Sequence, residues 1–104
     1  MSSVADFPLP ATKAIDLIRQ SVREGTYLMP ARFAEDEWPH VVYRRSAQRC
    51  LEEGEIIKGP VVNNRGHYEY QMYRLSAGQE LYLTVVLYKG PDWVVRVLEA
   101  KTHD

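Results

Sequence analysis

Cysteine and long apolar runs are scarce in this sequence. Cys50 is the single cysteine, so an intramolecular disulfide is excluded, which fits a reducing compartment. No apolar run approaches the roughly 20 residues that a membrane-spanning helix needs. The first ten residues, MSSVADFPLP, have neither the basic nor the apolar region of a secretory signal peptide. We therefore expect a cytoplasmic protein that does not bind membranes, with Cys50 as a small buried hydrophobic residue.

Positive charge is not in surplus either. The 104 residues include 13 Lys and Arg against 14 Asp and Glu, which gives a net charge of −1. Proteins that bind nucleic acids strongly usually have a basic surface, because phosphate contacts dominate their affinity. The balance weighs against strong nonspecific binding and leaves room for a local basic patch. The length and the hydrophobic content of 45% predict one globular domain.

The motifs of common metal and cofactor sites are missing. His40, His67 and His103 are scattered, and one cysteine cannot complete a tetrahedral zinc site with them. The sequence contains no P-loop, no dinucleotide-binding fingerprint and no nucleophile elbow. We expect no cofactor and no metal.

The first half of the chain has the apolar spacing of helices. Pro8 and Pro10 disfavour a helix at the start, so we expect residues 1–11 to form an arm and 12–104 to form the domain. Apolar residues three and four apart predict a helix over about 12–24.

Two residues predict the ends of this helix, with Thr12 as its N-cap and Gly25 just after its C-terminus. One or two helical turns are expected over 31–38, and a second helix over about 40–53.

After residue 54 the apolar period falls to two, which is typical of strands. The alternation predicts strands at 55–62, 67–75, 80–88 and 93–100, separated by turn residues. Pro60 has no amide hydrogen for a ladder, so the first strand is expected to be an edge strand or bulged. The order of elements predicts an α+β fold, in which two N-terminal helices pack on a four-stranded antiparallel meander.

The second predicted strand has a polar side. His67, Glu69, Gln71 and Tyr73 share parity, so they point to one face of the sheet. Glutamate and histidine are common general bases and acids, and glutamine can hold a phosphate or a hydroxyl. A solvated sheet face carries the same residue types, so both interpretations stay open.

Arginines gather on one side of the second predicted helix. Arg44, Arg45 and Arg49 are close enough along the helix to contact phosphates together. Glu52 and Glu53 follow one turn later and can neutralise them, so a solvated helix face is the alternative.

Three segments resemble a known family. AIDLIRQSVREGTYLMPARF (14–33) resembles the opening of small bacterial proteins related to the RelE-like ribonuclease toxins, MqsR-like toxins in particular. YQMYRLSAGQELYLTVVL (70–87), followed by VVRVLEAK (94–101), resembles the MqsR pattern. That pattern has a strand with Gln and Tyr-Arg, a turn with glycine, a strand with Tyr-Leu and a last strand ending in lysine. An allied uncharacterised bacterial family has the same layout, and the resemblance covers about 12–102.

The resemblance implies a metal-independent mRNA endoribonuclease, or a degenerate relative of one. It implies mRNA or the ribosome as a partner, and a cognate antitoxin that holds the protein. By position, the catalytic set would be Lys58, Gln71, Tyr82 and Lys101. Gly59-Pro60 and the net charge of −1 depart from the family pattern. RNA contacts are expected from Arg44, Arg45, Arg49, His67, Tyr73, Arg74 and Arg96.

Two other functions are compatible with the same fold. A non-enzymatic interaction module would bind protein through the sheet edge or an aromatic face. A small-molecule binder would use a pocket between Trp38, Trp93 and the tyrosines. The ribonuclease hypothesis gains support if the four catalytic candidates lie within about 10 Å of one another in one cleft, and positions on opposite faces would end it.

Overall fold

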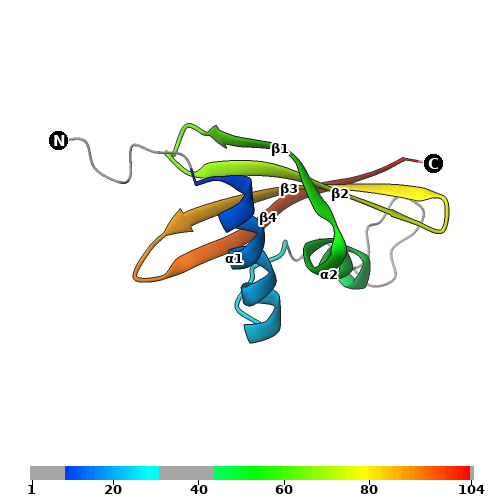
Figure 1. Ribbon diagram of the computed structural model, residues 1–104, viewed down its shortest axis with the longest axis horizontal. Coiled ribbons are helices and arrows are strands. Elements are labelled where there is room, and N and C mark those ends of the chain that lie inside the picture. The colour runs from blue at the N-terminus through cyan, green and yellow to red at the C-terminus, as the bar shows by residue number, and fades with distance from the viewer. Residues whose placement is uncertain (1–8, 31–43, 104) are drawn as a thin grey trace.

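The structure, a computed structural model, describes residues 9–30 and 44–103. Antiparallel strands form one sheet in the order β1-β2-β3-β4, and Figure 1 shows α1 and α2 on the same side of it. The prediction of an α+β fold with two helices and a four-stranded antiparallel sheet is confirmed. The elements are α1 (Ala11–Glu24), α2 (Arg44–Glu53), β1 (Glu55–Val62), β2 (Tyr68–Ser76), β3 (Gln79–Lys89) and β4 (Trp93–His103).

Helix α1 ends as predicted and begins one residue earlier than predicted. Gly25 adopts a left-handed conformation with φ of 70°, which glycine accepts without steric cost, and this ends the helix. The expected N-cap at Thr12 is wrong, because Pro10 occupies that position and its carbonyl accepts hydrogen bonds from the Lys13 and Ala14 amides. The Leu9 carbonyl accepts a hydrogen bond from the Tyr70 hydroxyl, which ties this end of the chain to β2. Residues 1–8 of the expected arm lie outside the described residues.

Helix α2 places its apolar side against the sheet. Ala47, Cys50 and Leu51 are fully buried, whereas the arginines of the same helix are exposed. The helical turns expected over 31–38, and the part of the second helix expected before residue 44, lie outside the described residues.

The core lies between the helices and one face of the sheet, which we call the inner face. Alternate residues of the strands point into it, and Ile18 of α1 and Leu51 of α2 cover them. Every second residue therefore points to the outer face, the side of the sheet that α1 and α2 do not cover. The buried inner-face residues are Tyr70, Met72, Leu81, Leu83, Val85, Leu87, Val95 and Val97.

Strand β1 is an irregular edge strand, as Pro60 predicts. Lys58 lies opposite Gln71 and Val61 lies opposite Glu69, with a shift of register between these pairs. Gly59 has φ of +112°, and a Cβ there would lie 2.5 Å from the Glu69 carbonyl oxygen. Glycine is needed at this position for both reasons.

The opposite edge of the sheet, β4, is covered in part. The Leu28 amide donates to the Val95 carbonyl, and the Val97 amide donates to the Leu28 carbonyl, each at 2.9 Å. No helix in 9–30 or 44–103 is long and apolar enough to cross a membrane.

Candidate functional site

The strand register brings the four candidate catalytic residues onto the outer face. Lys58 of β1 pairs with Gln71 of β2, and Tyr82 of β3 pairs with Lys101 of β4. The two pairs belong to adjacent rows, because Gln71 lies opposite Thr84, two residues from Tyr82. Directly opposite residues of antiparallel strands have Cβ atoms about 5 Å apart, and diagonal neighbours about 7–8 Å. All four side chains are therefore close enough to contact one oligonucleotide.

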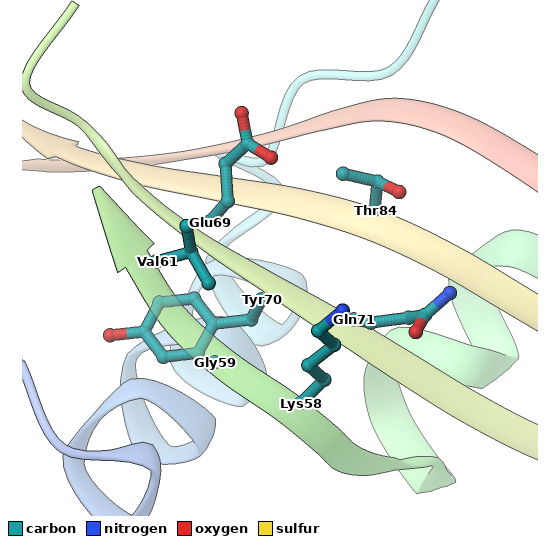
Figure 2. A pocket seen from close by; sticks show the side chains of 7 residues that line it. All are labelled: Lys58, Gly59, Val61, Glu69, Tyr70, Gln71 and Thr84. Atoms are coloured by element: carbon teal, nitrogen blue, oxygen red, sulfur yellow. The ribbon is translucent and has the colours of Figure 1, made fainter. Parts of the chain in front are cut away.

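A shallow hollow lies at the first of these rows. Its volume is about 270 Å³, and it exists because β1 bulges away from β2 at Gly59. Figure 2 shows the Lys58 side chain reaching from β1 toward Gln71, with Thr84 beyond it on β3. The hollow contains Lys58 and Gln71 but excludes Tyr82 and Lys101, which lie one row further along. It is lined by Lys58, Gly59, Val61, Glu69, Tyr70, Gln71 and Thr84.

The second row carries a hydrogen-bonded cluster. The rings of Tyr73 and Tyr82 are 5.1 Å apart between centroids and tilted by 52°. Both hydroxyls donate to Glu80, Tyr73 to Oε2 and Tyr82 to Oε1, each at 3.2 Å. His103 Nδ1 lies 3.6 Å from Glu80 Oε1. We call Tyr73, Glu80, Tyr82 and His103 the carboxylate cluster.

The environment of Tyr82 keeps its hydroxyl protonated. Desolvation by neighbouring groups, and then the hydrogen bond to Glu80, raise the pKa of Tyr82 above its ordinary value. The hydroxyl therefore keeps its proton at neutral pH. It can therefore donate a hydrogen bond, and here it donates one to Glu80 Oε1.

The other predicted RNA contacts are dispersed. Arg44, Arg45 and Arg49 lie on α2, on the helix side of the sheet, so they do not join the catalytic candidates. Arg74 points to the inner face as well, where its guanidinium pairs with Glu53 of α2 at 3.0 Å. Tyr73, in contrast, lies in the carboxylate cluster.

His67 and Arg96 lie toward the far end of the sheet. The His67 ring stacks on Tyr88 with centroids 4.2 Å apart. Arg96 is exposed on the outer face opposite Val86. Arg96 lies opposite Val86 and Lys101 lies opposite Tyr82, four residues apart along β3, so His67 and Arg96 belong to the surface around the candidate site and not to its centre.

The outer face is not a basic patch. Among the described residues, its cations are Lys58, Arg96 and Lys101, and its anions are Glu55, Glu69, Glu80 and Glu99. This balance matches the net charge of the chain and predicts weak binding of free nucleic acid at physiological salt.

Glu80 and His103 are the site residues that the sequence did not predict. Glu80 could have been found, because it is two residues from Tyr82 and so shares its face. His103 gives no such signal, because its place beside Glu80 depends on a bulge between β3 and β4. Without that bulge, Glu80 would lie opposite a different residue.

Two alternatives can be tested against the described residues. Burial raises the pKa of the Cys50 thiol to about 12, which disfavours a thiolate nucleophile. In 9–30 and 44–103, no group of three His, Cys, Asp or Glu residues could hold a metal ion. The pocket expected between Trp38 and Trp93 depends on Trp38, which lies outside the described residues.

Comparison of the chain with family models, curated proteins and solved structures finds no match.

Proposed function

We propose that this protein is a metal-independent mRNA endoribonuclease related to the RelE- and MqsR-like toxins, acting through the outer face of its sheet. The observation that supports the proposal is the strand register. It aligns Lys58 with Gln71 and Tyr82 with Lys101 in adjacent rows of one face. Residues that the resemblance selects from four separate strands would share a face by chance only in a minority of cases.

The chemistry of these groups fits RNA cleavage. Attack of a 2′-hydroxyl on the neighbouring phosphate builds negative charge on the phosphorus oxygens. Lys58 on β1 and Lys101 on β4 lie at opposite ends of the two rows, and their ammonium groups would stabilise that charge. Gln71 would hold the phosphate or the ribose by hydrogen bonds, and Tyr82 would protonate the leaving 5′-oxygen.

The charge of the outer face constrains how the substrate reaches it. Glu69, Glu80 and Glu99 repel free RNA, so little affinity comes from the phosphate backbone. The enzyme would then act on RNA that is presented by a partner, such as message bound to the ribosome.

The test is cleavage of a short end-labelled RNA in EDTA at low salt. We expect wild-type protein to cleave it, and Tyr82→Phe and Lys101→Ala to be slower by about 10²-fold or more. Tyr27→Phe and Lys13→Ala change the same residue types on the helix side and should cleave at the wild-type rate. Expression of wild-type protein in cells should likewise slow growth and degrade message. Expression of Tyr82→Phe or Lys101→Ala should do neither. Intact RNA with wild-type protein in both settings would refute the proposal.

A second function is favoured by a different observation. Ile57, Val61 and Val62 on the edge strand β1 are 46%, 52% and 56% exposed. A non-enzymatic module would use this edge to pair with a strand of another protein. This alternative predicts that the protein leaves RNA intact. It also predicts that Val62→Lys weakens association with the product of a neighbouring gene, as measured by light scattering.

A further inference from the structure

The four-residue set lacks a group that can accept a proton. Cleavage must remove the proton of the 2′-hydroxyl. The ammonium groups of Lys58 and Lys101 are donors without a lone pair, and the amide of Gln71 does not titrate. Tyr82 keeps its own proton, as argued above. A base has to come from elsewhere on the outer face.

Glu80 is the carboxylate that accepts a hydrogen bond from Tyr82. Its Oε1 accepts the hydrogen bond from Tyr82, and its Oε2 accepts the one from Tyr73. Two oxygens offer about four acceptor positions, so room for a substrate hydroxyl remains. The Glu80 side chain is 34% exposed and that of His103 is 76% exposed, so the site is open to substrate.

We propose that Glu80 is the general base of the cleavage reaction, paired with Tyr82 as the acid. This inference rests on the ribonuclease function proposed above and adds a catalytic residue to it. The substrate class is single-stranded RNA with a free 2′-hydroxyl beside the scissile phosphate.

The cleavage step balances in atoms and protons without a further reactant. The 2′-oxygen gives its proton to the Glu80 carboxylate and forms a bond to phosphorus. The bond from phosphorus to the 5′-oxygen breaks, and the Tyr82 hydroxyl gives its proton to that oxygen. Protonated Glu80 then returns a proton to the Tyr82 oxygen along the 3.2 Å hydrogen bond that joins them. The products are a 2′,3′-cyclic phosphate and a 5′-hydroxyl, with no change of oxidation state.

The charged and titratable groups around Glu80 come from all four strands. His103 of β4 places its Nδ1 atom 3.6 Å from Glu80 Oε1. Lys101 lies opposite Tyr82 and adds positive charge in the neighbouring row. Glu55 of β1 contributes, after desolvation and Glu80, to the raised pKa of Tyr73. Tyr73, Tyr82 and His103 contact Glu80, whereas Glu55 and Lys101 lie in the neighbouring row of the sheet.

The experiment is single-turnover cleavage of the labelled RNA in EDTA from pH 4 to 9. We expect the wild-type rate to fall at acid pH, because protonated Glu80 cannot accept a proton. Glu80→Gln should be slower by about 10²-fold or more and lose that acidic limb. Glu80→Asp should keep the acidic limb of the pH–rate profile. Glu99→Gln, a matched loss of one carboxylate on the same face opposite Thr84, should keep the acidic limb and should not slow cleavage.

The possible outcomes distinguish failure of this inference from failure of the proposed ribonuclease function. If wild-type protein cleaves and Glu80→Gln cleaves as fast with the same acidic limb, the base is not Glu80, while the ribonuclease function stands. If wild-type protein cleaves nothing in this assay and also leaves message intact in cells, the ribonuclease function fails and the inference with it. If Glu80→Gln does not fold by circular dichroism, Glu80→Asp decides. Its shorter carboxylate should slow cleavage while keeping the acidic limb, and cleavage at the wild-type rate would overturn the inference.

Discussion

Replacing Gly59 by alanine tests how the hollow on the outer face is built. The new Cβ would lie 2.5 Å from the Glu69 carbonyl oxygen and 3.0 Å from the Tyr70 Cα, both backbone atoms of β2. The positive φ of +112° adds strain for any residue with a side chain. A conformation of this kind costs about 1–3 kcal/mol, and forcing atoms into a packed site costs a further 1–3 kcal/mol or so. We therefore expect Gly59→Ala to lower the free energy of unfolding by roughly 2–6 kcal/mol.

Gly66→Ala is the matched control. Gly66 also has a positive φ, +78°, but a Cβ there meets nothing within 4 Å. Its cost should be confined to backbone strain, about 1–2 kcal/mol. Urea denaturation of wild type and both variants gives the free energies by linear extrapolation. Equal losses of stability in the two variants would refute the account of Gly59. They would show that contact of the new Cβ with the β2 backbone costs no free energy beyond the backbone strain.

Three further predictions follow from particular contacts. Leu83→Ala removes a fully buried side chain from the middle of β3 and should cost about 2–5 kcal/mol in urea denaturation, while a change under 1 kcal/mol would mean that the core lies elsewhere. Burial raises the pKa of Tyr70 to about 12 from 10.0, so its contribution to stability is complete below pH 10 and is lost as pH rises toward 12. The difference in stability between wild type and Tyr70→Phe should shrink over that range, and a constant difference would contradict the assignment. Arg74→Ala breaks a partly exposed pair with Glu53, so it should change stability by no more than about 1 kcal/mol and leave RNA cleavage unchanged, whereas slower cleavage would place Arg74 at the substrate.

Strand periodicity was enough to predict the sheet. Alternation in the second half of the chain gave all four strands to within one to three residues at each end, and Pro60 correctly predicted an irregular edge. The parity of β2 also correctly placed Glu69, Gln71 and Tyr73 on one face, and the structure buries Tyr70 and Met72 on the other. These features depend on local alternation alone, so one sequence contains them.

The same parity rule limits the predicted RNA contacts. Tyr73 and Arg74 are adjacent in a strand and must point to opposite faces, so both could not belong to one surface. The structure accordingly directs Arg74 toward Glu53 of α2. The alternation on which the sheet prediction rested could have excluded Arg74 from the site.

Register and bulges could not be predicted. The extra residues in β1 around Gly59, and the shift between β3 and β4 after Thr84, decide which side chains lie opposite each other. The positions of Lys58 beside Gln71 and of His103 beside Glu80 depend on them. A bulge depends on contacts between strands, and those have no local signature strong enough to fix its position.

The central claim is that one face of the sheet receives RNA, and NMR titration tests it most directly. A short single-stranded RNA with 2′-O-methyl groups cannot be cleaved, so binding can be followed on isotope-labelled protein at low salt. We predict that the largest changes in amide chemical shift fall on Gln71, Tyr82, Thr84 and Lys101. Changes confined to α2 around Arg45 and Arg49, or to the exposed edge of β1, would contradict the account.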